Sequence, residues 1–110
     1  MSFVLKKLNK LPVRVKGTLP GEDGKPVDFD FTLHCKRLSQ EEIEAVQSDK
    51  DGSVKDFLRT NTEGWQDVKD EGGAAVIFSA EGLNDLLSNA GMPMLCFSSY
   101  MKQIAATAKN

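Results

Sequence analysis

Few residues in this chain could do chemistry. His34 is the only histidine, which excludes any catalytic or metal site built from two histidines. Cys35 follows it directly, but neighbouring residues of a strand point to opposite faces, so we do not expect a Cys–His nucleophile pair. Cys35 and Cys96 are the only cysteines. Two are too few to define a disulfide scaffold, and we expect both to be small buried hydrophobic residues.

The acidic residues do not form a metal-binding pattern. The segment 49–52 resembles part of a calcium loop, but aligning its glycine places Gln47 where the first aspartate belongs and Leu58 where the bidentate glutamate belongs. The glutamates at 41, 42 and 44 fit a helix cap and first turn better than acid–base catalysis. No phosphate-binding glycine loop is present. The sequence therefore predicts a protein without a metal, a cofactor or enzymatic activity.

Composition indicates one globular domain over residues 1–110. The chain is 40% hydrophobic and 27% charged, close to the averages of globular proteins. Its net charge of -2 favours neither nucleic acid nor an anionic membrane. No apolar run approaches the roughly 20 residues that span a bilayer, and the first ten residues lack a secretory signal. We therefore expect a cytoplasmic protein that binds neither nucleic acid nor membranes.

The first third of the chain carries the period-2 pattern of β-strands. Polar and apolar residues alternate on both sides of a turn at 21–26, which contains two glycines and an aspartate. This pattern predicts a β-hairpin with one apolar face, which other elements must cover because a lone hairpin is only marginally stable. Residues 1–9 fit either a short helix or a strand. The apolar positions are Leu11, Val13, Val15 and Leu19 in the first strand and Val27, Phe29, Phe31, Leu33 and Cys35 in the second.

Helix signals follow from residue 39 onward. Ser39 and Glu42 form a capping-box pattern for a helix that continues to about residue 47, and a second short helix is predicted at 54–59. A loop at 61–64 then leads to 65–68, which fits either a third strand or a turn. A tight turn is predicted at 70–73. Ser79 is the expected N-cap of the next helix, and Gly91 is expected to end it in the left-handed conformation. Pro93 suits the first turn of a last helix.

These elements predict an α+β fold. Residues 1–38 are mainly β and residues 39–110 mainly α, so that an N-terminal antiparallel hairpin, with or without a third strand, packs against three to four helices. The last helix carries an apolar stripe of Phe97, Tyr100, Met101, Ile104 and Ala108. One interpretation is that this stripe covers the hairpin.

The other interpretation is that part of the stripe stays exposed and binds a partner. Three other helical segments compete to cover the hairpin, and methionines adapt to varied partners. We therefore predict that Phe97, Tyr100, Met101 and Ile104 are the partner-binding residues. A homo-oligomer formed through the same stripe is the competing use.

Several short patterns occur in a fixed order between residues 29 and 104. They are Phe31-Thr32-Leu33-His34-Cys35-Lys36-Arg37-Leu38-Ser39-x-Glu41-Glu42, Trp65-x-Asp67-Val68-x-Asp70-Glu71-x-Gly73, Phe78-Ser79-x-Glu81-x-Leu83-x-x-Leu86-Leu87, and Tyr100 in a final helix. In this order and spacing the chain resembles the tail assembly chaperones of long-tailed bacteriophages and prophages.

The resemblance implies a small protein of the bacterial host cytoplasm that binds the long, helical tape measure protein. It would keep that client soluble until tail-tube subunits polymerise around it, and the tail-tube protein is a second candidate partner. Such chaperones are often made in two lengths by ribosomal frameshifting. The better-known members are largely helical, whereas this chain begins with a hairpin, so partner-site positions do not transfer. The alternatives are a structural tail or virion component and a small acidic secretion-type chaperone.

Overall fold

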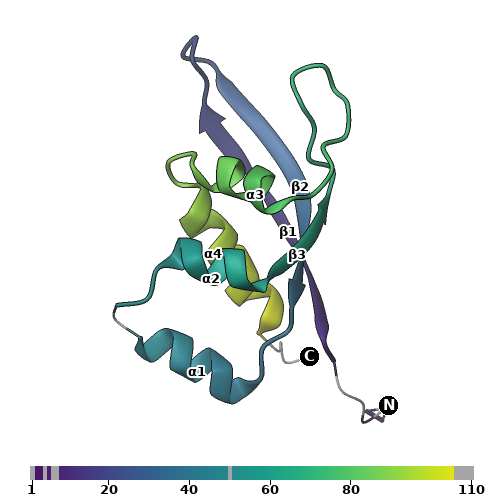
Figure 1. Ribbon diagram of the computed structural model, residues 1–110, viewed down its shortest axis with the longest axis vertical. Coiled ribbons are helices and arrows are strands. Elements are labelled where there is room, and N and C mark those ends of the chain that lie inside the picture. Colours follow the sequence, from purple (N-terminus) through teal and green to yellow (C-terminus); the bar gives the residue numbers. More distant parts are fainter. Residues whose placement is uncertain (1, 4, 6–7, 50, 106–110) are drawn as a thin grey trace.

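The helices cover one face of a three-stranded antiparallel sheet and leave the other face open (Figure 1). The computed structural model describes residues 2–3, 5, 8–49 and 51–105. Its elements are β1 (Lys10–Pro20), β2 (Pro26–Lys36), α1 (Gln40–Ser48), α2 (Val54–Asn61), β3 (Thr62–Gln66), α3 (Ala80–Leu87) and α4 (Met92–Ile104). This arrangement confirms the predicted α+β fold and decides the open alternative in favour of a third strand.

The β1–β2 hairpin forms with the predicted parity. Val13 pairs with Leu33 and Val15 pairs with Phe31, and these apolar side chains are buried against the helices. The other face carries the polar residues, among them the ion pair of Arg14 with Asp30, whose two hydrogen bonds measure 2.9 and 2.6 Å. Burial of one face fixes the register, since a shift by one residue would turn every apolar side chain to solvent.

The apolar alternation continues beyond the helix layer. Leu19 and Phe29 are only partly buried, and Val27 is 53% exposed. The turn of the hairpin extends past the helices (Figure 1). At the edge of the covered region Gly17 leaves room for Phe29 and Leu95, because a Cβ there would lie 3.0 and 3.1 Å from their side chains.

The predicted loop at 61–64 is wrong. Asn61 is the last residue of α2, and its side-chain amide donates to the carbonyl of Phe57 at 2.9 Å. β3 begins at the next residue and pairs with β2, so that Trp65 lies opposite Leu33. The polar composition of this segment alone predicts a loop. It forms a strand directly after the helix because pairing with β2 satisfies its backbone hydrogen-bonding groups.

Trp65 is anchored by the segment that follows β3. Its indole N–H donates to the carbonyl of Val76 at 2.8 Å, and its ring packs edge-on against Phe78 with the centroids 5.1 Å apart. Between them the chain makes the predicted tight turn, in which Asp70 accepts from the backbone N–H of Ala74 at 3.0 Å. The only Trp is thus fixed between the sheet and the start of α3.

The predicted N-caps are confirmed, but the predicted end of the helix that follows Ser79 is wrong, because α3 ends at Leu87 with Ser88 as a right-handed C-cap. Ser39 and Glu42 form the capping box of α1, and Ser79 accepts from the N–H of Gly82 at the start of α3. Gly91 has a φ of 86° and precedes α4, which contains Pro93 in its first turn. α4 ends at Ile104, and Ala108, the last member of the predicted stripe, lies outside the described residues.

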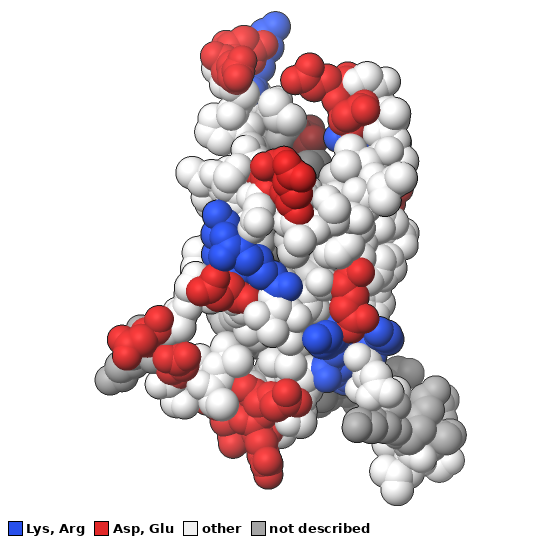
Figure 2. All heavy atoms as spheres, viewed as in Figure 1, with Lys and Arg blue, Asp and Glu red and all other residues white. Residues whose placement is uncertain are grey.

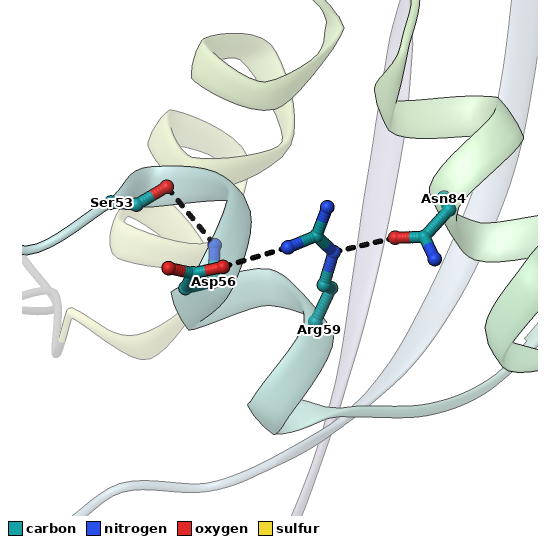
Figure 3. A network of polar contacts seen from close by, with 4 residues as sticks. All are labelled: Ser53, Asp56, Arg59 and Asn84. Carbon is teal, nitrogen blue, oxygen red and sulfur yellow. Dashed lines mark hydrogen bonds and ion pairs between the residues drawn. The ribbon is translucent and has the colours of Figure 1, made fainter.

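A polar network joins α2 to α3 (Figure 3). Arg59 forms an ion pair with Asp56 at 2.7 Å, and its Nε donates to the amide oxygen of Asn84 at 2.5 Å. Ser53 caps α2 by accepting from the N–H of Asp56. These groups are exposed to solvent, so the network orients the two helices more than it stabilises them.

Candidate functional site

The histidine and cysteines are separated as predicted. His34 lies on the open face of the sheet, where its Nε2 is 3.1 Å from the amide oxygen of Gln66. Cys35 is buried on the opposite face. Burial raises the pKa of Cys35 to about 11 and that of Cys96 to about 12, so both are protonated thiols at neutral pH. In the part of the chain that the structure describes, no three metal-ligating side chains come together.

Tyr100 does not belong to a surface, and its prediction as a partner-binding residue is wrong. Its side chain is fully buried, and its hydroxyl donates to the carbonyl of Lys36 at 2.8 Å and accepts from the N–H of Leu38 at 3.2 Å. Burial raises the pKa of Tyr100, and the Leu38 N–H opposes that shift in part. Tyr100 therefore holds α4 against the segment that leads from β2 into α1.

The buried stripe of α4 differs from the predicted one. It consists of Met92, Cys96 and Tyr100, which are spaced by four residues and are all at most 2% exposed. The predicted stripe contains neither Met92 nor Cys96. The spacing of four could have predicted this stripe, because residues one helical turn before and after a buried Cys96 lie on the same side of the helix.

The other predicted partner residues occupy a neighbouring stripe of α4. All three are partly buried, and Met101 and Ile104 pack against the core, whereas Phe97 is not among the side chains that do so. Phe97 meets Phe57 of α2 edge-on, with ring centroids 5.3 Å apart. Phe97 is therefore the point where the predicted stripe reaches a groove that opens between the helices.

This groove lies between α1 and α2 and has a volume of about 720 Å³. Val46 contributes from α1, Val54 and Phe57 from α2, and Phe97 from α4, and these four side chains are partly buried. The remaining lining residues are polar or glycine. They are Gln47, Asp49, Asp51, Gly52, Ser53, Asp56, Thr60 and Asn61.

The groove exists because α1 is attached mainly through its first half. Ile43 is its one buried residue among those described, and the preceding Leu38 donates its N–H to Tyr100. Val46 lies one turn further on and faces the groove instead of the core. Figure 1 shows α1 set apart from the other helices at the lower end of the molecule.

The rim of the groove is acidic. Asp49, Asp51 and Asp56 line it, and no Lys or Arg does so in the described part of the chain. Asp56 is already paired with Arg59, whereas Asp49 accepts only the backbone N–H of Asp51 among the hydrogen bonds described, at 3.1 Å. Figure 2 shows acidic side chains gathered over α1 and the connection that follows it. An apolar floor with an acidic rim suits a ligand that combines apolar and cationic groups.

The chain matches no family model, and no curated protein or solved structure is significantly similar to it. None of the helices in the described residues has both the length and the apolar character needed to cross a bilayer.

Proposed function

We propose that this protein is a tail assembly chaperone of a long-tailed bacteriophage or prophage, working in the host cytoplasm. Its client would be the helical tape measure protein, which it keeps soluble until the tail tube forms. The proposal rests on the sequence patterns between residues 29 and 104 and on one structural observation, the apolar groove between α1 and α2.

The size of the groove suits a helical client. At about 720 Å³ it is several times larger than the roughly 150 Å³ cavity that holds a benzene molecule, so it can take several apolar side chains. An amphipathic helix presents such side chains at spacings of three, four and seven residues. The paired rings of Phe57 and Phe97 provide a rigid aromatic contact of the kind that dominates binding energy.

Met101 and Ile104 extend the same surface. They follow Phe97 by one and two turns of α4 and are partly exposed. A client helix of three turns, about 16 Å long, could contact the groove and this stripe together. The surface binds through burial of apolar side chains and involves no covalent step.

Val46 offers the cleanest test of this site. In co-expression with the tape measure protein, wild type should keep the client in the soluble fraction and co-purify with it. Val46→Glu places a charge in the groove and should abolish both effects. Ala45→Glu is the matched control, because Ala45 is exposed on the same helix and does not line the groove. Circular dichroism establishes that both variants are folded. A folded Val46→Glu protein that still solubilises the client would contradict the proposed site.

A further inference from the structure

The N-terminal segment combines exposed apolar side chains with positive charge. Phe3, Leu5 and Leu8 are 75%, 92% and 43% exposed, an unusual density of uncovered apolar side chains. The first ten residues of the sequence also contain three lysines and no acidic residue. One of these lysines, Lys10, pairs with Glu63 at 2.5 Å, and the other two, at positions 6 and 7, lie outside the described residues.

The region around the groove has the opposite charge. Residues 39–53 contain five acidic residues and one lysine, in a protein whose net charge is only -2. Two of these acids, Asp49 and Asp51, are exposed at the rim, beside the apolar floor. The basic apolar segment and the acidic apolar groove are therefore complementary in both charge and hydrophobicity.

We infer that the groove binds the N-terminal segment of a second copy of this chain. The chain's own segment does not fill its groove, because Phe3 and Leu5 remain exposed while the groove is open. Asn9, whose carbonyl accepts from the N–H of Arg37 at 2.9 Å, fixes the point from which the segment leaves the sheet.

The segment is long enough for such an exchange. Eight extended residues span up to about 28 Å, and α1, which forms one wall of the groove, is about 13 Å long. Reciprocal exchange, in which each copy places its segment in the groove of the other, closes as a two-fold dimer. The contact would be weakened by salt, because it would pair lysines with Asp49 and Asp51, which are exposed. Self-association and client binding would then use the same groove.

A charge-swap experiment tests this inference on the full chain. Light scattering after size exclusion should show a mass approaching twice the 12.1 kDa monomer for wild type, with dissociation at high salt. Lys6→Glu with Lys7→Glu should be monomeric, and so should Asp49→Lys with Asp51→Lys. Mixing these two variants should restore the dimer, because each segment then meets a groove of opposite charge.

Two further variants complete the design. Leu5→Asp should also give a monomer, because it replaces an apolar side chain of the segment by a charge. The variant should stay folded, since Leu5 makes no core contact that the substitution could disrupt. Glu22→Lys with Glu71→Lys is the control for Asp49→Lys with Asp51→Lys. It makes the same change in net charge at exposed positions outside the groove and should leave the dimer intact. A wild type that stays monomeric at high concentration, a mixture that stays monomeric, or a Leu5→Asp protein that still dimerises would each overturn the inference.

Discussion

Replacing Tyr100 by Phe removes a single buried hydroxyl from the middle of the fold. That hydroxyl makes two hydrogen bonds, one to the carbonyl of Lys36 and one from the N–H of Leu38. Phe fills the same space, so the substitution leaves the packing of α4 intact and isolates the polar contribution. The two backbone groups would lose their partner at the junction between β2 and α1.

The expected loss of stability follows from these two bonds. An intramolecular hydrogen bond contributes about 1 kcal/mol net, and a buried group left unsatisfied costs about 1–3 kcal/mol. Leu38 is only partly buried, so water can reach part of the site and the lower end applies. We expect Tyr100→Phe to lower the free energy of unfolding by about 2 kcal/mol. For a domain of this size that corresponds to roughly 8 °C in Tm.

Urea unfolding followed by the fluorescence of Trp65 measures this change. Ser99→Ala is the control, because it removes a hydroxyl from the same helix that donates only to the carbonyl of Leu95. The control should change the unfolding free energy by about 0.5 kcal/mol or less. If Tyr100→Phe changed stability no more than the control, α4 would not hold the entry to α1 in the way described.

The pH dependence of stability gives a second test of the two hydrogen bonds made by Tyr100. Burial raises the pKa of Tyr100, so the stability it contributes is fully present below its usual value of about 10 and is lost as the pH rises through the folded-state value. The difference between wild type and Tyr100→Phe should therefore narrow above about pH 10.

Three further changes test the core and the helix ends. Phe31→Ala should cost about 3–5 kcal/mol in urea unfolding, because Phe31 is 5% exposed. Asp30→Ala, at an exposed ion pair on the open face, should lower stability far less, and equal losses would mean a wrong register. The buried thiols of Cys35 and Cys96 should react with Ellman's reagent only as fast as the protein unfolds, and rapid labelling of the native protein would show that they are accessible. The stability that comes from their raised pKa values should be lost as the pH rises from about 9 toward 11–12. Gly91→Ala should lower stability by about 1–2 kcal/mol in thermal melts, because Gly91 has a positive φ and a Cβ there meets no neighbour that could compensate; an unchanged Tm would contradict the left-handed conformation.

Local patterns predicted most of the fold. The alternation from Leu11 to Cys35 determined the hairpin because only one of its faces is buried. Ser39 and Ser79 mark helix starts because a side-chain acceptor is needed at those positions whatever surrounds them. Gly91 has the predicted left-handed conformation, but it precedes α4 and does not end α3. These features depend on residues close together in the chain.

The errors arose where distant segments decide the outcome. The strand at 62–66 replaces an expected loop because β2 offers an edge to pair with. The stripe predicted on α4 follows from helical spacing alone, whereas packing on the sheet buries Met92, Cys96 and Tyr100. The groove could not be predicted at all. Its shape depends on the angle at which α1 leaves the sheet, and no local pattern specifies that angle.

Hydrogen exchange in the presence of the proposed client, the tape measure protein, tests the central claim most directly. Binding of a helical client in the groove should slow exchange in α2, in the second half of α1 and along α4 from Phe97 onward, relative to the free protein. The hairpin turn at 21–26 and the open face of the sheet should exchange as before. Protection confined to β1 or to the hairpin turn, with α1 and α2 unchanged, would show that the client binds elsewhere and would contradict the groove as the binding site.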